Sequence, residues 1–313
     1  MSGFAGAIRS RGRSAVLDHP GAAADAALLA VALTWGTSFA LQKIVTRQMG
    51  PDVFNAARFA AALLVLGPLF WPHVRRTPRR LVVEGLGIGV VLGGAMVLQS
   101  MGLMQTTATA GGFISGLPVV ITPILAVPLL GERPGGSALA GVALATVGLA
   151  LISVSDDLRV GIGDAVVLVS SVLFGLQIVL TGRIAGRADP RAVGTLQVAG
   201  ALAVCVAGTL LFDRVPTSVT PDAVAITAYL GIVNLGFVWV VQSWAQRHRS
   251  ATRTALVLTM EPVFAALFAW LWLGESLAPR AALGAAAVLG AMVVASAGPS
   301  LTTFLRARGT MEP

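Results

Sequence analysis

Long apolar runs separated by short polar segments fill most of this chain. One helix needs about 20 mostly apolar residues to cross a bilayer core that is about 30 Å thick. Dividing the sequence at its charges, prolines and glycines leaves ten runs of about that length. We therefore predict an all-α integral membrane protein with ten transmembrane helices. The predicted spans are 24–46, 52–71, 82–103, 107–130, 136–155, 161–184, 190–212, 222–245, 251–273 and 279–299.

Composition agrees with a protein that lies in lipid. Of 313 residues, 56% are hydrophobic and 12% are charged, and the mean hydropathy is +0.83. The net charge of +8 comes from arginines in short gaps between apolar runs rather than on one soluble face, so we expect no nucleic-acid partner. With one cysteine and three scattered histidines, neither an internal disulfide nor a metal cluster is expected.

Basic residues predict the orientation of the spans, because cytoplasmic loops carry an excess of lysine and arginine. With the N-terminus inside, 16 basic residues fall on the cytoplasmic side and 5 outside, and Arg58 lies within a span. We expect both termini to be cytoplasmic in a multi-pass inner-membrane protein, and the first span to be uncleaved. The predicted divisions are a basic tail at 1–22, a first repeat at 23–155, a second repeat at 156–299 and a tail at 300–313.

The second half of the chain repeats the first. An offset of 143 residues aligns Gln99-Ser100 with Gln242-Ser243, and an offset of 139 aligns Gly36 with Gly175 and Arg58 with Gln197. Since each unit has five spans, an odd number, the two units should have inverted orientations. Such inverted repeats enclose a central cavity in many transporters, with the substrate near the midplane. The same offset of 143 aligns Ala108-Thr109 with Ala251-Thr252 and Leu130-Gly131-Glu132 with Leu273-Gly274-Glu275.

Glu261 and Pro262 are the most unusual pair inside the predicted spans. Glu261 lies about 15 Å along its helix, near the middle of the bilayer. Pro262 removes one helix hydrogen bond and frees a carbonyl oxygen near Leu258. We interpret the pair as a locally broken helix that lines a wet cavity, with proton coupling as a further hypothesis. The alternative is a protonated acid that bonds a neighbouring helix to fix packing.

Other polar residues within the spans form the rest of a candidate substrate cavity. Arg58 either pairs with an acid such as Glu261, attracts an anionic substrate group, or extends its side chain to the membrane surface. Trp35 is a candidate wall residue. For the uncharged residues the alternative is hydrogen bonding between helices; this set is Thr37, Ser38, Gln42, Gln99, Gln177, Asn234 and Gln242.

The remaining polar and small residues have structural interpretations. Gly85, Gly89 and Gly93 recur every four residues, which allows close helix packing. Glu84 is expected near the loop arginines at the membrane surface. Glu132 and Glu275 are expected to cap helix ends rather than to contact substrate.

Several motifs together resemble the EamA-type domain of the drug/metabolite transporter superfamily. They are TWGTSFALQK at 34–43, ARF at 57–59, PVVITPILAVPLLGERP at 118–134 and EPVFAALFAWLWLGESL at 261–277. The resemblance covers about 24–299 and implies ten helices in two inverted repeats around a central cavity. It also implies export or exchange of small metabolites, amino acids or drugs. The second half departs from the first in having Phe174 in place of Trp35 and Gln197 in place of Arg58.

Function classes can be compared on motifs alone. The sequence has no zinc-protease, nucleophile-elbow or phosphate-loop motif, so we expect no enzyme, no cofactor and no ATP-driven pump. The predicted function is secondary transport of a small molecule by alternating access in the lipid bilayer. A membrane-embedded enzyme or binding subunit for a lipid-like substrate is the alternative. Whether the protein forms a homodimer is left undecided by the sequence.

Overall fold

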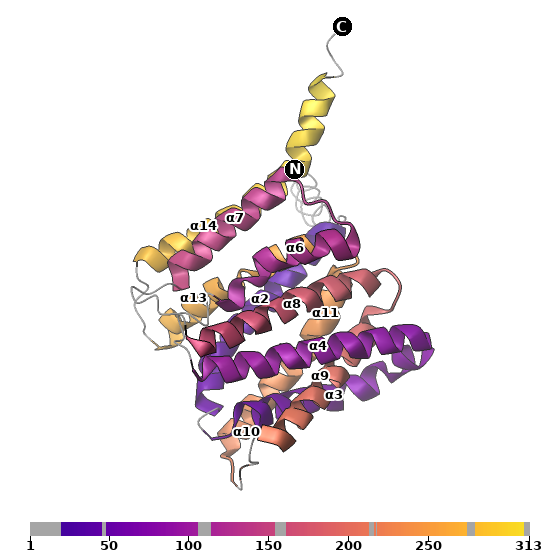
Figure 1. Ribbon diagram of the computed structural model, residues 1–313, viewed down its shortest axis with the longest axis vertical. Coiled ribbons are helices and arrows are strands. Elements are labelled where there is room, and N and C mark those ends of the chain that lie inside the picture. The colour runs from indigo at the N-terminus through magenta and orange to yellow at the C-terminus, as the bar shows by residue number, and fades with distance from the viewer. Residues whose placement is uncertain are drawn as a thin grey trace, which may run out of the picture.

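Helices account for nearly all of the structure, which is a computed structural model that describes residues 20–45, 48–105, 114–153, 161–212, 216, 218–273 and 279–309. These residues contain no strand, and helix occurs in each of the ten predicted spans (Figure 1). The helices are α2 (Pro20–Val45), α3 (Pro51–Arg76), α4 (Arg79–Leu103), α6 (Pro118–Leu130), α7 (Gly136–Ser153), α8 (Ile162–Ala185), α9 (Pro190–Phe212), α10 (Pro221–Tyr229), the π-helix η1 (Leu230–Gly236), α11 (Phe237–Ala245), α12 (Ala251–Leu258), α13 (Glu261–Leu273) and α14 (Pro279–Gly309).

Length and composition allow five of the described helical segments to cross a membrane: Pro51–Arg76, Arg79–Leu103, Ile162–Ala185, Pro190–Leu211 and Pro221–Ala245. Shorter apolar helices cover Ile114–Leu130, Gly136–Leu151 and Ala282–Ala295. Large apolar side chains such as Leu64, Ile124 and Leu210 are more than half exposed. A soluble protein would not leave so many exposed together, whereas lipid tails cover them at no cost.

Two helix ends lie beyond the predicted spans. Helix α3 continues to Arg76 instead of ending at residue 71, and it includes Pro68 and Pro72. Helix α14 continues to Gly309, ten residues past the predicted end at 299, and its last turns project from the bundle (Figure 1). The hydropathy pattern marks the end of an apolar run, but leucine, alanine and arginine favour helix on either side of that point. The predicted tail at 1–22 lies outside the described residues up to residue 19.

Equivalent helices of the two halves run antiparallel. A β-carbon on Gly208, late in α9, would lie 3.4 Å from the Asp52 carboxylate, early in α3. At the other ends of these helices, Arg191 Nη1 lies 2.6 Å from His73 Nε2. In α7 and α14, Gly141 faces Ala291 and Gly148 faces Gly284. These are the second and seventh and the fifth and tenth predicted spans, so the two halves have opposite orientations, as the repeat predicts.

Contacts between the halves also come in matched pairs. Helix α4 packs on α9 and α8, and the equivalent segment of the second half, α10–η1–α11, packs on α3 and α2. The contact of α6 with α8 is matched by that of α13 with α2. Exchanging the halves therefore preserves these main contacts, as expected for a duplicated unit.

Glycines let α4 approach α9 closely. A β-carbon on Gly85 would lie 3.0 Å from Leu196 Cβ, and one on Gly93 would lie 2.7 Å from Val204 Cβ. At Gly89 the added carbon would lie 2.9 Å from the Cα atoms of both Gln197 and Gly200. The packing role expected for the three glycines is confirmed.

Candidate functional site

The ninth predicted span is broken beside Glu261. Helix α12 ends at Leu258, the residues Thr259 and Met260 form a turn, and α13 begins at Glu261. The break follows from Pro262, which has no N–H to donate to the carbonyl oxygen of Leu258 four residues earlier. The predicted local break is therefore confirmed. Glu261 is partly buried, and no hydrogen bond or ion pair joins its side chain to another residue in the described part of the chain.

The fourth predicted span is interrupted at the equivalent place. A turn at Leu117 separates the helical residues 114–116 from α6, which starts at Pro118. Here the carbonyl that proline frees is that of Ile114, and it accepts a hydrogen bond from Ser171 Oγ at 2.6 Å. With the 139-residue offset, the residue equivalent to Ser171 is Ala32, which has no donor. The first break is thus internally bonded, whereas the second combines an unbonded acid with a freed carbonyl.

Helix α2 lies between this break and η1. Gly36 allows close packing, because a β-carbon there would lie 2.6 Å from Phe264 Cβ. On the same stretch, Trp35 Nε1 donates to the Asn234 carbonyl at 3.1 Å, and Asn234 Nδ2 donates to the Thr34 carbonyl at 2.7 Å. A π-helical segment inside an α-helix is frequent at functional sites, and Asn234 is within η1. The middle of α2, with Trp35 and Gly36, therefore contacts both Asn234 of η1 and α13, the helix that begins at Glu261.

A second polar group, the glutamine cluster, joins α8, α9 and α11. Gln177 Nε2 donates to Gln197 Oε1 at 2.6 Å, and Gln197 Nε2 donates to Ser243 Oγ at 3.2 Å. Gln242 Nε2 lies within hydrogen-bonding distance of Gln177 Oε1 and Gln246 Oε1, at 3.3 Å each. Gln242 is 1% exposed, and its Oε1 has no hydrogen-bond partner among the described residues. The glutamine cluster consists of Gln177, Thr181, Gln197, Gln242, Ser243 and Gln246.

Arg58 has a different environment from Glu261, and no ion pair joins them in the described structure. Its Nη2 donates to Asn55 Oδ1, and its guanidinium lies 4.3 Å from the centre of the Phe54 ring. Asn55 Nδ2 in turn donates to Ser100 Oγ at 2.7 Å. Arg58 is 3% exposed, so its side chain does not reach the surface. The 143-residue offset makes Ser100 equivalent to Ser243, whose hydroxyl likewise accepts from a side-chain amide, that of Gln197.

The other predicted cavity residues are scattered. Thr37 and Ser38 hydroxyls donate to carbonyls of their own helix, those of Thr34 and Trp35. Gln99 Nε2 donates to Ser115 Oγ at 3.2 Å. The Gln42 side chain lies outside the described residues. Of the nine candidates whose side chains are described, eight divide among the middle of α2, the glutamine cluster and the Arg58 group, and Gln99 bonds Ser115 apart from them. Within the described structure, these hydrogen bonds do not join the groups into one cluster.

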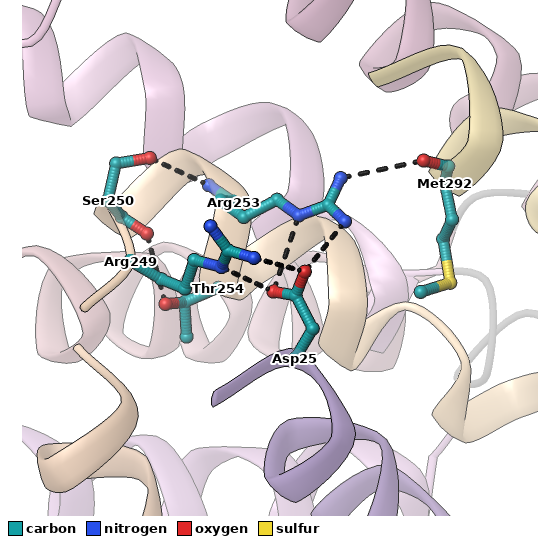
Figure 2. Close-up of polar contacts among 6 residues, drawn as sticks. All are labelled: Asp25, Arg249, Ser250, Arg253, Thr254 and Met292. Atoms are coloured by element: carbon teal, nitrogen blue, oxygen red, sulfur yellow. Dashed lines mark hydrogen bonds and ion pairs between the residues drawn. The ribbon is translucent and has the colours of Figure 1, made fainter. Parts of the chain in front are cut away.

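An ion cluster that the sequence analysis missed joins α2 to α12 (Figure 2). The Asp25 carboxylate accepts from Arg249 Nε at 2.8 Å and Nη2 at 2.7 Å, and from Arg253 Nη2 at 3.0 Å. Arg249 lies in the turn just before α12 and Arg253 lies in the first turn of that helix, so both arginines stand at the start of α12. Asp25 is the only acid of the predicted span 24–46. That isolated charge was the signal in the sequence that could have indicated a buried ion pair. We call Asp25, Arg249 and Arg253 the Asp25 cluster.

Glu132 makes a second contact between the halves at the same helix end. Its carboxylate accepts from Ala251 N at 2.7 Å and from Thr252 Oγ1 at 2.9 Å. An acid at a helix N-terminus accepts hydrogen bonds from the free N–H groups there, and its negative charge is attracted to the positive end of the helix dipole. The predicted capping role of Glu132 is confirmed, and Glu275 lies outside the described residues. Glu84 pairs with Arg80 and Arg187, as its predicted place near the loop arginines requires.

We expect Asp25→Asn to lower the stability of the folded protein by about 1–2 kcal/mol, because it leaves two partly buried arginines without their carboxylate. Thermal unfolding in detergent measures this. Glu84→Gln is the matched control: it also removes an acid shared by two arginines, but Arg80 is 79% exposed, so the loss should be under about 0.5 kcal/mol. Equal losses in both variants would contradict the prediction.

The sequence and the fold are both similar to those of known proteins. The sequence model of the EamA-like transporter family matches residues 22–154 and again residues 161–297. An uncharacterized transporter of Archaeoglobus fulgidus is 28% identical over 273 residues, which are 87% of this chain and 85% of that protein. A crystal structure of a protein with 20% identity matches 93% of this chain and 99% of its own, with a TM-score of 0.75. That likeness shows the fold.

Proposed function

The chain belongs to the EamA-like transporter family, and from that premise we propose that it is a secondary transporter that moves a small polar solute across the cytoplasmic membrane by alternating access. The observation that carries this proposal is the pair of interrupted helices in equivalent positions of the two halves, at Leu117 and at Thr259–Met260. Interrupted helices near the midplane, contributed by inverted repeats, form the substrate and ion sites of many transporters.

The solute site in this proposal lies beside the middle of α2. Glu261, the freed Leu258 carbonyl, Trp35 and Asn234 are its principal residues. An acid at half depth that bonds no other described residue is free to bind a proton or the cationic group of a solute. The equivalent break in the first half, at Leu117, is apolar and internally bonded. The second half therefore supplies the ionisable group, Glu261. Proton coupling through Glu261 is part of this proposal.

The proposed topology has ten crossings, five in each half, with both termini in the cytoplasm. It rests on the antiparallel pairing of equivalent helices and on the loop arginines, four of which lie between positions 75 and 80. Labelling a cysteine placed at Arg76, in a Cys205→Ala background, with an impermeant reagent from each side tests the orientation. Labelling from outside would reverse it.

Flux in proteoliposomes tests the function directly. Purified protein is reconstituted, and a panel of labelled amino acids is followed across the membrane with and without a pH gradient. We expect at least one solute to move several times faster than in protein-free liposomes, chemically unchanged. Chemical conversion without net movement would instead support the membrane-embedded enzyme, and the absence of both, over a panel widened to drugs, would contradict transport.

A further inference from the structure

A pocket of about 460 Å³ opens at the end of the bundle that holds Glu132. Its walls come from the end of α6, from α8, and from the turn between α11 and α12. They include Leu130, Glu132, Arg183, Gln246, Arg249 and Ser250. Pockets that hold small molecules usually measure about 300–1,000 Å³. This pocket is separate from the break at Glu261, and the sequence analysis assigned it no role.

The pocket wall carries charges of both signs. Glu132 supplies a carboxylate that is bonded to Ala251 and Thr252. Arg249 supplies a guanidinium that is bonded to Asp25. Arg183 is exposed, and no ion pair involves its guanidinium in the described structure. A ligand here therefore meets one acid and one arginine that lacks an acidic partner in the described structure, in a pocket whose lining is mostly polar.

Gln246 connects the pocket to the buried glutamine cluster. It lines the pocket, is 6% exposed, and is within hydrogen-bonding distance of Gln242 Nε2 through its Oε1. Gln242, whose Oε1 has no partner in the part of the chain that the structure describes, is followed by Gln177 and Gln197. A buried acceptor without a donor is unfavourable unless a water or ligand N–H reaches it. Hydrogen-bonding groups thus continue from the pocket into the bundle.

We propose that this pocket is a binding site for a small zwitterionic solute, one that carries both an ammonium and a carboxylate group. The ammonium binds at Glu132 and the carboxylate binds at Arg183. A ligand with a single charge leaves the opposite charge of the pocket unmatched. The site rests on the proposed function in one respect: under the proposed orientation, it receives the transported solute from the cytoplasm.

Binding here also acts on the contacts between the halves. Glu132 and Arg249 line the pocket, and both hold the halves together at this end, Glu132 through α12 and Arg249 through Asp25. A solute ammonium competes with Ala251 and Thr252 for the Glu132 carboxylate, while the solute carboxylate binds Arg183. Occupancy therefore weakens the contacts that close this end, which is the differential interaction that a ligand-driven opening requires.

The test is a binding titration of the purified full-length protein with L-leucine and with its two singly charged analogues, isoamylamine and isocaproate. We expect leucine to bind, and each analogue to bind at least about tenfold more weakly. Arg183→Gln should weaken leucine binding by about tenfold. Arg187→Gln is the matched control: Arg187 is also exposed, is one turn further along, pairs with Glu84 and lies outside the pocket. It should bind leucine as the unmodified protein does.

Three results would overturn the site: no binding of leucine, equal binding of an analogue, or unchanged leucine binding in Arg183→Gln. Unchanged thermal unfolding of both variants confirms that they fold. Flux separates this inference from the proposed function. Transport of any solute in the panel without leucine binding refutes the pocket and leaves transport standing. Leucine binding that depends on Arg183, in a protein that moves no solute, supports the site and refutes transport.

Discussion

Gly89→Leu is expected to abolish the folded protein, because α4 and α9 meet at this glycine. Even a single added carbon would lie 2.9 Å from the Cα atoms of Gln197 and Gly200. Those atoms belong to the backbone, so no rotation of a side chain can relieve the overlap. Overpacking usually costs about 1–3 kcal/mol where neighbours can shift, and we expect at least the upper end of that range here. Size-exclusion chromatography of the detergent extract should show aggregate in place of the monodisperse peak.

Gly87→Leu is the matched control for this prediction. Gly87 lies two residues earlier on the same helix, and nothing lies within 4 Å of a β-carbon placed there. The same leucine at this exposed position should contact lipid and leave the yield and the monodisperse peak unchanged. A folded Gly89→Leu protein, or equal losses in both variants, would mean that α4 and α9 do not pack as described.

Glu261→Gln is expected to reduce transport by at least about tenfold while insertion and yield stay normal. The amide keeps the shape of the side chain but cannot take up or release a proton, and it carries no charge with which to bind a cationic group. Because the carboxylate bonds no other described residue, its replacement should not disturb packing. Flux in proteoliposomes is measured on both proteins between about pH 6 and pH 8.

Glu84→Gln serves as the control for Glu261→Gln. Glu84 is also an acid within a helix, but it pairs with Arg80 and Arg187 near the polar end of α4. This variant should transport at the unmodified rate. Transport by Glu261→Gln at that rate throughout the pH range would remove the acid from the mechanism and leave it a packing role.

The parts of the fold that the sequence predicts are those set by local chemistry. The break beside Glu261 follows from a proline four residues after Leu258, and the cap at Ala251 follows from an acid that the repeat places after each interrupted helix. Helix ends such as Arg76 are harder to predict. The hydropathy pattern shows where the chain leaves the lipid, but a helix can continue beyond that point.

The candidate site was harder to predict than the fold. Their position inside apolar spans identified Gln177 and Gln242 as candidates, but it could not tell that they bond each other while Gln99 bonds Ser115. Those choices depend on which helices become neighbours, which is a property of the whole bundle. The Asp25 cluster was not predicted for the same reason, because 224 residues separate Asp25 from Arg249 in the sequence.

The packing of α4 has a consequence for biosynthesis. This helix lies mainly against α8 and α9, and only lightly against α3, its neighbour in sequence. When the ribosome has delivered the first five predicted spans to the membrane, the glycine face of α4 has no permanent neighbour until α9, the seventh predicted span, is inserted. The duplicated units are therefore not two domains that mature in turn, and the nascent first half must persist among lipids as an unfinished assembly.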